Sequence, residues 1–336
     1  MNTSVTRPFV VSGLMKRPDR QPEGATSHRT FNMRGKLPFT LALGFSLLLS
    51  AFAQQGSAAG SSPAFKDGIA VGPQYDTTHV YVRPEDFDTF VASLIATFGG
   101  TQTKEGVFTV TPTASLTMSQ LVLTPVGSIS VFGFKTPVPF PFGAERTGYL
   151  VKDLDAAVSL ARSNGASVIV APFPDPIGRD VVVQWPGGVN MQLYWHTLSP
   201  NYAEMKTVPE NRVYIAADRA QDFIDRFVRF SHGRVIDDSR SAPGIEIGRP
   251  GDTYREVQIE SLFGKVRVLV TDGHLPYPYG HELAGYEVSS LLETLDKAKS
   301  SGAQILVAPF ASRGRDSAVI QFPGGYIAEI HDVAAR

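Results

Sequence analysis

Histidine, arginine and amide side chains on predicted strands are the candidates for chemistry in this 336-residue chain. His79 lies between apolar neighbours in an alternating run, so its imidazole either binds a ligand or bonds to an adjacent strand. Gln192 could orient a polar ligand group or satisfy a hydrogen bond on a buried sheet face. Arg146, Arg212 and Arg267 could clamp a carboxylate or phosphate, but arginines on strand edges more often face water.

Other titratable residues have a plainer interpretation. Glu145 and Glu282 recur at matching positions of an internal repeat, and we expect exposed strand charges there rather than a paired general base. The chain has no H-x-x-x-H or H-x-H spacing, so we expect four further histidines of the repeat region at the surface. These are His196, His274, His281 and His331.

Composition excludes several functional classes. The chain has no cysteine, which excludes a disulfide framework, a thiolate metal site and a cysteine nucleophile. Residues 1–53 hold seven of the 31 basic and two of the 32 acidic residues, which leaves 24 basic and 30 acidic residues in the rest. That balance gives no footprint for nucleic acid. A glycine-rich phosphate loop and a serine nucleophile elbow are also absent from the sequence.

The N-terminal segment has the pattern of a secretory signal peptide. Arg34 and Lys36 precede an apolar run, Leu37 to Phe52, and the run ends in an A-x-A site at Ala53. The run is shorter than the roughly 20 apolar residues of a membrane span, although an uncleaved anchor is the alternative. We predict a signal peptide over residues 1–53, with Met33 as the alternative start, followed by a linker over 54–76. The mature protein is then exported, periplasmic or secreted, with no membrane attachment.

An internal repeat organises the rest of the chain. With an offset of 137 residues, Pro139–Gly143 recurs as Pro276–Gly280, Val170–Phe173 as Val307–Phe310, and Pro186–Gly188 as Pro323–Gly325. Upstream the offset is 133 residues, which aligns His79–Val82 with Arg212–Ile215. The repeat predicts one domain at 77–198 and a second at 210–333.

Each half divides again into two modules of the order strand, helix and three strands. The second helix of the first half begins after Asp153 as N-cap and ends near Gly165, and Ser290 and Glu293 have capping-box spacing before its counterpart. We predict an α+β fold of four βαβββ modules, paired into two curved mixed sheets with helices outside. Concave sheet faces bind small ligands, and the duplication supplies paired modules without an oligomer.

The motifs together resemble the vicinal oxygen chelate superfamily, which includes glyoxalase I, bleomycin-resistance proteins and extradiol dioxygenases. The resemblance spans residues 77–333 and is carried by the strand His79–Val82 with Asp86-Phe87 after it, the strand-to-helix run Gly148–Val158, Gly165-Ala166, and the closing strand Pro186–Tyr194. It implies the paired-module fold and a small-molecule site.

In metal-dependent members of that superfamily, two histidines and a glutamate hold one divalent ion. Carried over to the first half, the ligand positions are His79, Arg146 and Gln192; in the second half they are Arg212, Leu283 and Glu329. A guanidinium has no lone pair to donate, so neither half has the triad. The resemblance with these departures predicts no cofactor, with a divalent metal (Zn, Ni, Mn or Fe) as the alternative.

We therefore predict a glyoxalase-like exported protein that binds a small organic molecule. The predicted ligand-binding residues are His79, Arg146, Gln192, Arg212 and Glu329. The alternatives are a metal-dependent lyase or dioxygenase that uses His79 with Gln192 or Glu329, and a structural or interaction module. Whether the protein is an enzyme stays open, as does pairing of the modules in order or crosswise, the latter bringing His79 and Glu329 to one site.

Overall fold

The computed structural model describes residues 68–280 and 283–333. The predicted signal peptide and the first part of the predicted linker lie outside these residues. Residues 68–76 pack on the first sheet: Ala70 is 1% exposed and bridges Val151, and the Val71 amide donates to the Leu150 carbonyl at 3.0 Å. In the described part of the chain, every helix is too short or too polar to cross a membrane.

Three of the four modules follow the predicted order of one strand, a helix and three strands, and the first module has two short strands in place of one after its helix. The first half contains β1 (Thr77–Tyr81), α1 (Phe87–Phe98), β2 (Thr101–Gln102), β3 (Gly106–Phe108), β4 (Thr117–Thr124), β5 (Gly127–Phe134), β6 (Thr147–Leu150), α2 (Leu154–Ser163), β7 (Ser167–Asp175), β8 (Gly178–Gln184) and β9 (Asn190–His196). The second half contains β10 (Glu210–Ala216), α3 (Ala217–Ser231), β11 (Arg234–Pro243), β12 (Thr253–Ser261), β13 (Gly264–Thr271), β14 (Leu283–Glu287), α4 (Leu291–Ser300), β15 (Gln304–Ser312), β16 (Arg315–Gln321) and β17 (Ile327–Val333). Short 3-10 turns cover Pro73–Tyr75, Pro84–Asp86, Gly244–Ile247 and Pro323–Gly325.

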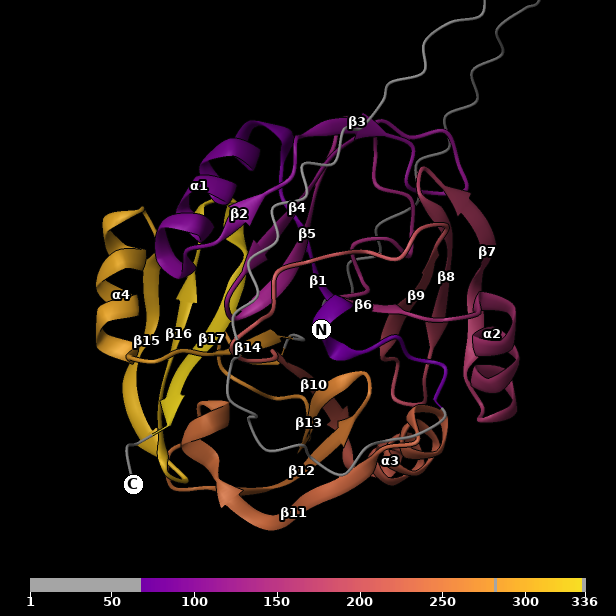
Figure 1. Ribbon diagram of the computed structural model, residues 1–336. Helices are drawn as coiled ribbons and strands as arrows, with labels where there is room; N and C mark the ends of the chain where they lie inside the picture. Colours follow the sequence, from indigo (N-terminus) through magenta and orange to yellow (C-terminus); the bar gives the residue numbers. More distant parts are fainter. Residues whose placement is uncertain (1–67, 281–282, 334–336) are drawn as a thin grey trace, which may run out of the picture. The chain divides into compact units, whose positions relative to one another are not determined.

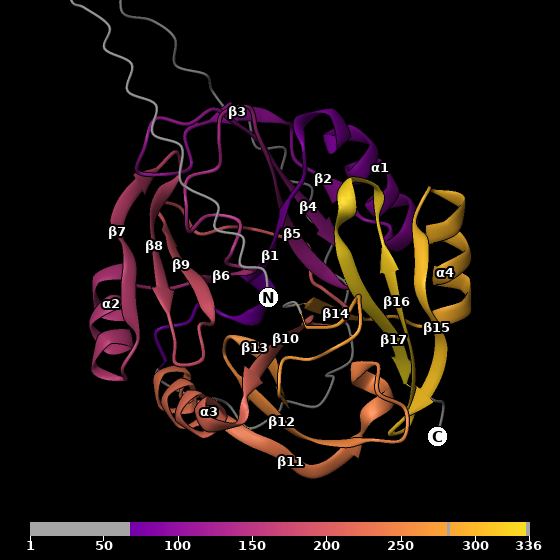
Figure 2. The same ribbon diagram turned by 180° about the vertical axis from the view of Figure 1, so that it is seen from behind.

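Each half builds one curved mixed sheet (Figures 1 and 2). The first has the strand order β2-β4-β5-β1-β6-β9-β8-β7, with β3 paired to β4, and the second has the order β11-β12-β13-β10-β14-β17-β16-β15. In both sheets the first strands of the two modules meet antiparallel at the centre, β1 with β6 and β10 with β14. The modules therefore pair in order through their sheets, which settles the question that the sequence left open.

Local signals position the helices as predicted. Asp153 caps α2, its Oδ1 accepting from the Ala156 amide at 2.9 Å, and Gly165 follows with φ of +84°. Ser290 caps α4 in the same way, accepting from the Glu293 amide at 3.3 Å. The capping box is only half formed, because the Glu293 carboxylate binds Lys297 at 2.8 Å instead of reaching back to the cap.

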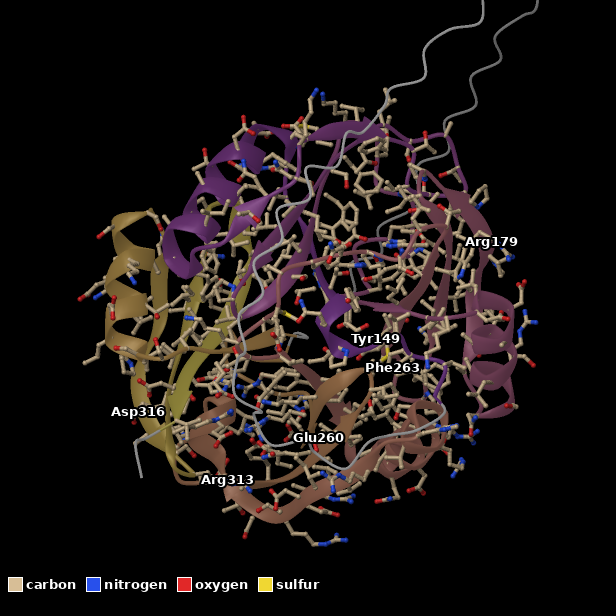
Figure 3. The ribbon with its side chains drawn as sticks, in the orientation of Figure 1. Tyr149, Arg179, Glu260, Phe263, Arg313 and Asp316 are labelled. Atoms are coloured by element: carbon tan, nitrogen blue, oxygen red, sulfur yellow. The ribbon has the colours of Figure 1, made fainter. Side chains whose placement is uncertain are left out.

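The helix-bearing faces of the two sheets form apolar cores that cross between the halves. α1 contacts α4, and the pair lies side by side in both views (Figures 1 and 2). A second core joins residues around α2 and α3; within it the rings of Tyr149 and Phe263 are 4.8 Å apart (Figure 3). Burial of these faces provides the main stabilisation and leaves the opposite, concave faces for polar residues.

Candidate functional site

The concave face of the first sheet encloses a cavity of about 350 Å³, here named the first cavity. Strand alternation aims every second residue at it. Its walls include His79 and Tyr81 from β1, Ser130 and Phe132 from β5, Asp180 from β8 and Gln192 from β9. A cavity of this size, lined by aromatic rings and a few polar groups, suits a small organic ligand.

His79 is held in place within this wall. It is 2% exposed, its Nδ1 lies 3.6 Å from Glu145 Oε1, and the Tyr81 hydroxyl donates to the same carboxylate. The prediction that Glu145 is an exposed charge is wrong, because this residue is fully buried between the two side chains. Its repeat partner, Glu282, lies outside the described residues. Burial, reinforced by the Glu145 charge, raises the pKa of Tyr81 well above its usual value.

The imidazole of His79 needs the glycine opposite it. Gly148 lies on β6 across from Thr77 and beside Gln192 of β9. A Cβ atom at position 148 would be 2.4 Å from His79 Nε2, so a larger residue there would displace the ring. Gln192 is 9% exposed, and its amide makes no side-chain hydrogen bond with the residues that the structure describes. His79 and Gln192 thus line the same cavity.

Asp180 is the cavity residue that sequence reasoning missed. It is 5% exposed and pairs across the sheet with Tyr194, and within the described ranges its carboxylate has neither a hydrogen bond nor an ion-pair partner. Burial, with a smaller contribution from Asp175, raises the pKa of Asp180 well above its usual value. The apolar residues of this strand predict that it begins at Val181, whereas β8 begins at Gly178 and includes Asp180.

Arg146 lies apart from the first cavity. It is half-buried and borders two other cavities, of about 40 and 250 Å³, the larger of which it shares with His79 and Tyr277. The Arg146 carbonyl accepts from the His79 amide at 2.9 Å, so the two residues are cross-strand neighbours whose side chains do not form an ion pair.

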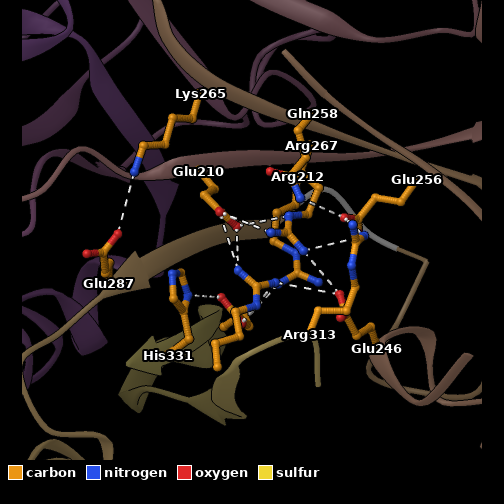
Figure 4. Close-up of polar contacts among 12 residues, drawn as sticks. Glu210, Arg212, Glu246, Glu256, Gln258, Lys265, Arg267, Glu287, Arg313 and His331 are labelled. Carbon is orange, nitrogen blue, oxygen red and sulfur yellow. Dashed lines mark hydrogen bonds and ion pairs between the residues drawn. The ribbon is translucent and has the colours of Figure 1, made fainter. Parts of the chain in front are cut away.

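The concave face of the second sheet is filled by charged side chains (Figure 4). We name this set the ion-pair cluster: Glu210, Arg212, Glu246, Glu256, Arg267, Arg315, Glu329 and His331. Arg212 Nη1 lies 3.1 Å from Glu329 Oε1, and the two side chains are 3% and 2% exposed. Arg267 reaches Glu246 and Glu256 at 3.1 Å each. The expectation that Arg212 and Arg267 face water is therefore wrong; they bind carboxylates of this same chain.

The cluster favours the ionised forms of Glu329 and Glu210. Burial alone would raise the pKa of Glu329, but Arg212 and His331 outweigh it and hold that pKa well below its usual value. Glu210 behaves alike: Arg267 and Arg315 overcome its burial and lower its pKa from 4.5 to about 2. These attractions oppose the cost of removing the charges from water.

The two concave faces differ at positions that strand pairing makes equivalent. Ser130 pairs with His79 where Arg267 pairs with Arg212, and matching pairs relate Thr77 to Glu210, Ser119 to Glu256, and Gly178 to Arg315. Each small residue of the first sheet thus corresponds to a long charged residue of the second. Thr77, Ser119 and Ser130 line the first cavity, so the volume that three of these four charged side chains occupy in the second half is open in the first.

A larger hollow in the second half, of about 490 Å³, lies at the ends of β10, β12 and β13. Its charged lining residues include Arg249 and Asp272, which bind each other at 2.7 Å. Their pairing leaves this hollow without the uncommitted buried polar group that the first cavity has in Asp180.

Only His79 and Glu329 match the metal ligands that the resemblance implies, and they lie in different sheets. In the first half the ligand positions offer one imidazole, one guanidinium and one amide, from His79, Arg146 and Gln192. In the second half, donor atoms of Glu210, Glu329 and His331 lie within 4.8 Å of one another. The prediction that His331 is a surface histidine is wrong, because it is 2% exposed and faces the same side as Glu329 two residues earlier.

Guanidinium groups already surround that second set of donors. Arg212 and Arg315 approach Glu329 and Glu210 at 3.1 and 3.2 Å, and a cation placed among them would meet their positive charges. Neither donor set therefore fits the divalent ion that the resemblance implies.

Comparison with known proteins agrees with this architecture. No protein-family model matches the chain, and no curated protein matches it. A mutant of 4-hydroxymandelate synthase from Streptomyces coelicolor is similar in structure, with 12% identity and a TM-score of 0.51 over 77% of this chain and 92% of that one. The likeness confirms the predicted fold of paired modules.

Other similar structures have lower TM-scores. A Mn(II)-bound glyoxalase from Novosphingobium aromaticivorans has 12% identity and a TM-score of 0.46 over 76% of this chain and 80% of that one. A 2,2',3-trihydroxybiphenyl 1,2-dioxygenase from Sphingomonas wittichii has 12% identity and a TM-score of 0.48 over 76% and 89%. The fold is what these likenesses describe; function has to be argued from the site.

Proposed function

We propose that the first half of the protein binds a small organic molecule in the first cavity, and that the second half serves as a structural partner. The observation that carries the proposal is the contrast between the two concave faces. The first encloses about 350 Å³ beside uncommitted polar groups on Asp180 and Gln192, whereas long ion-paired side chains fill the second. Apolar walls with few polar groups are typical of small-molecule sites.

The test fills the cavity without changing its charge. Ser130→Phe puts a ring on β5 inside the first cavity, and Ser300→Phe puts the same ring on the exposed face of α4 as a matched control. With 2-phenylethanol as the probe in calorimetric titrations, we expect Ser130→Phe to weaken binding about tenfold or more. Ser300→Phe should bind the probe like the wild type. Equal affinity in all three proteins would place the probe elsewhere and reject the proposal.

The proposed site works without a complete metal centre. His79 and Gln192 supply at most two ligands, and catalytic metal sites usually have three protein ligands. A lyase or dioxygenase that uses His79 with Glu329 is less well supported, because Glu329 belongs to the second sheet and is bound there by Arg212.

Elemental analysis tests that part of the proposal. The protein, purified without a histidine tag and equilibrated with Zn, Ni, Mn or Fe, should retain far less than one ion per chain. About one ion per chain in the wild type, lost in His79→Ala, would reject the proposal of a metal-free site and favour a metal-dependent enzyme.

We also propose that the protein is exported, from the basic and apolar pattern before Ala53. Mass spectrometry of the protein from a periplasmic or culture fraction should find a chain that begins near Gln54. A full-length chain that stays with the cells would contradict export by a cleaved signal.

A further inference from the structure

The first cavity has an unbalanced negative charge. Asp180 and Asp175 both line it, and the only lysine or arginine among its lining residues is Lys104, which is exposed and makes no ion pair with the residues that the structure describes. His79 is already beside Glu145, and burial lowers the pKa of His196, which favours its neutral form. Among the described residues, no buried cation therefore faces the carboxylate of Asp180.

This arrangement differs from every buried carboxylate of the ion-pair cluster. Glu246, Glu256 and Glu329 each lie within 3.1 Å of a guanidinium nitrogen. A buried charge is costly unless it is paired, and Asp180 is 5% exposed. The repeat places Ser317 where Asp180 stands, since both residues pair with the same position of the last strand. The acidic group is thus particular to the half that has the cavity.

Aromatic rings stand beside the same carboxylate. Tyr194 is the cross-strand neighbour of Asp180, its hydroxyl donates to the Tyr75 carbonyl, and its ring lies 5.0 Å from that of His196. Tyr202 and Phe142 complete this side of the lining. Aromatic faces attract cations as well as apolar groups, and the attraction is strongest where water is excluded.

We infer that the ligand of the first cavity is a small organic cation, a protonated amine on an apolar body, and that Asp180 is its counter-ion. The inference rests on the proposed function and adds the chemical class of the ligand. The amine would pair with the Asp180 carboxylate at the β8–β9 side, while the apolar body would lie toward Phe132 and Tyr81 across the sheet. Ligand binding would then neutralise the one buried carboxylate of the cavity that the chain leaves without a partner.

Three probes of similar shape and different charge separate the effect of ligand charge from that of ligand shape. They are phenethylamine, 2-phenylethanol and 3-phenylpropionate, titrated calorimetrically near neutral pH into the full-length or naturally processed protein. We expect phenethylamine to bind about tenfold or more tightly than 2-phenylethanol, and 3-phenylpropionate to bind most weakly. Asp180→Asn should reduce the affinity for phenethylamine to that for 2-phenylethanol and leave the neutral probe unchanged.

A matched variant controls for net charge. Asp155→Asn removes the same charge from the exposed face of α2, where Asp155 binds Arg179, and should keep the preference for the amine. Thermal melting of each variant shows that it is folded before titration. If Asp180→Asn melts below the assay temperature, Asp180→Glu, which moves the charge by one methylene, should keep a preference for the amine over the alcohol.

The outcomes distinguish a wrong ligand class from a wrong binding site. If 2-phenylethanol binds as tightly as phenethylamine, or if Asp180→Asn keeps the preference for the amine, the inference that the ligand is a cation is wrong. The proposal that the first cavity binds a small molecule is then unaffected. That result would assign Asp180 to the neutral form, donating a hydrogen bond. If none of the three probes binds to the wild type, the proposed function is rejected, and the inference fails with it.

Discussion

The concave faces of the two sheets differ at matched positions of the repeat, although the strands that carry them follow the same order. Thr77, Ser119, Ser130 and Gly178 in the first half correspond to Glu210, Glu256, Arg267 and Arg315 in the second. Both halves keep apolar residues on the helix side, where the cores lie. The fold provides a curved sheet, and the size of a few residues decides whether that curve encloses a cavity or an ion-pair cluster.

The halves also treat buried carboxyl groups in opposite ways. In the second half, guanidinium groups hold Glu210 and Glu329 in the charged form. In the first half, Asp76 and Asp180 have no cationic side chain within 4 Å among the described residues, and burial raises the pKa of both. The buried carboxylates of the second face are therefore paired with cations, whereas a proton or a bound cation would stabilise the buried carboxyl groups of the first half.

The largest expected effect comes from breaking the ion-pair cluster. Arg212→Leu leaves the buried Glu329 carboxylate with His331 at 2.9 Å and Arg315 at 3.9 Å. We expect a loss of about 3–5 kcal/mol in the free energy of unfolding, measured by urea titration with tryptophan fluorescence. His79→Leu, at the equivalent position of the first half, should cost about 1–3 kcal/mol.

A double variant serves as the control for this comparison. Arg212→Leu with Glu329→Leu removes both charges and should recover most of the loss, because no unpaired charge then stays buried at that pair. If Arg212→Leu costs no more than His79→Leu, the cluster does not stabilise the second half in the way described.

The next effect is the pH dependence of Glu210, which Arg267, Arg315 and His331 face, together with the like charge of Glu329. A folded-state pKa of about 2 against 4.5 corresponds to about 3 kcal/mol. Because the folded pKa is lowered, this stability is present above pH 4.5 and is lost as the pH falls toward 2. The stability difference between wild type and Glu210→Gln, followed by urea titration from pH 7 to pH 3, should therefore shrink on acidification.

Thr77→Val is the matched substitution in the first half, since Thr77 occupies the same position and has no titratable group. Its cost should not vary over that pH range. A pH-independent difference for Glu210→Gln would contradict the assigned coupling between Glu210 and the two arginines.

A smaller effect of opposite sign is expected at Asp180. Its folded pKa is raised, so its ionisation weakens the unliganded fold as the pH rises above about 4. Asp180→Asn should therefore stabilise the ligand-free protein near pH 7, and by less at pH 4, in the same urea titrations. Asp155→Asn should show no such gain, because Arg179 lowers the pKa of Asp155. Destabilisation by Asp180→Asn at both pH values would indicate a structural role for the carboxylate.

Much of the fold could be predicted from the sequence, because its signals are local or repeated. The 137-residue offset gives the duplication, and caps such as Asp153 and Ser290 fix where helices begin. Strand ends were less predictable. The residues Ser167–Val170 predict only the first part of β7, because the strand continues through two prolines and two register shifts to Asp175.

The site was predictable only in part, because its partners are distant in sequence. His79 and Gln192 could be found from their strand positions. Arg267 is buried because it binds carboxylates such as that of Glu210, which lies 57 residues earlier in the sequence. The pairing of modules was equally open, since every module offers the same apolar face. One signal was available and missed: comparing the alternate residues of equivalent strands would have set Ser130 against Arg267 and shown that one concave face is small and the other charged.

The smallest expected effect tests what the halves have in common. Asp153 and Ser290 cap the equivalent helices α2 and α4, at 2.9 and 3.3 Å from the amides they bind. Replacing an N-cap by alanine typically costs about 0.5–2 kcal/mol, and a charged oxygen at the shorter distance should be at the upper end. We therefore expect Asp153→Ala to lower the free energy of unfolding by more than Ser290→Ala, with no change in the affinity for 2-phenylethanol in either variant. Because neither cap faces the first cavity, a loss of probe affinity would mean that the helix layer and the concave face are coupled, and the two faces of each sheet could not be treated as independent.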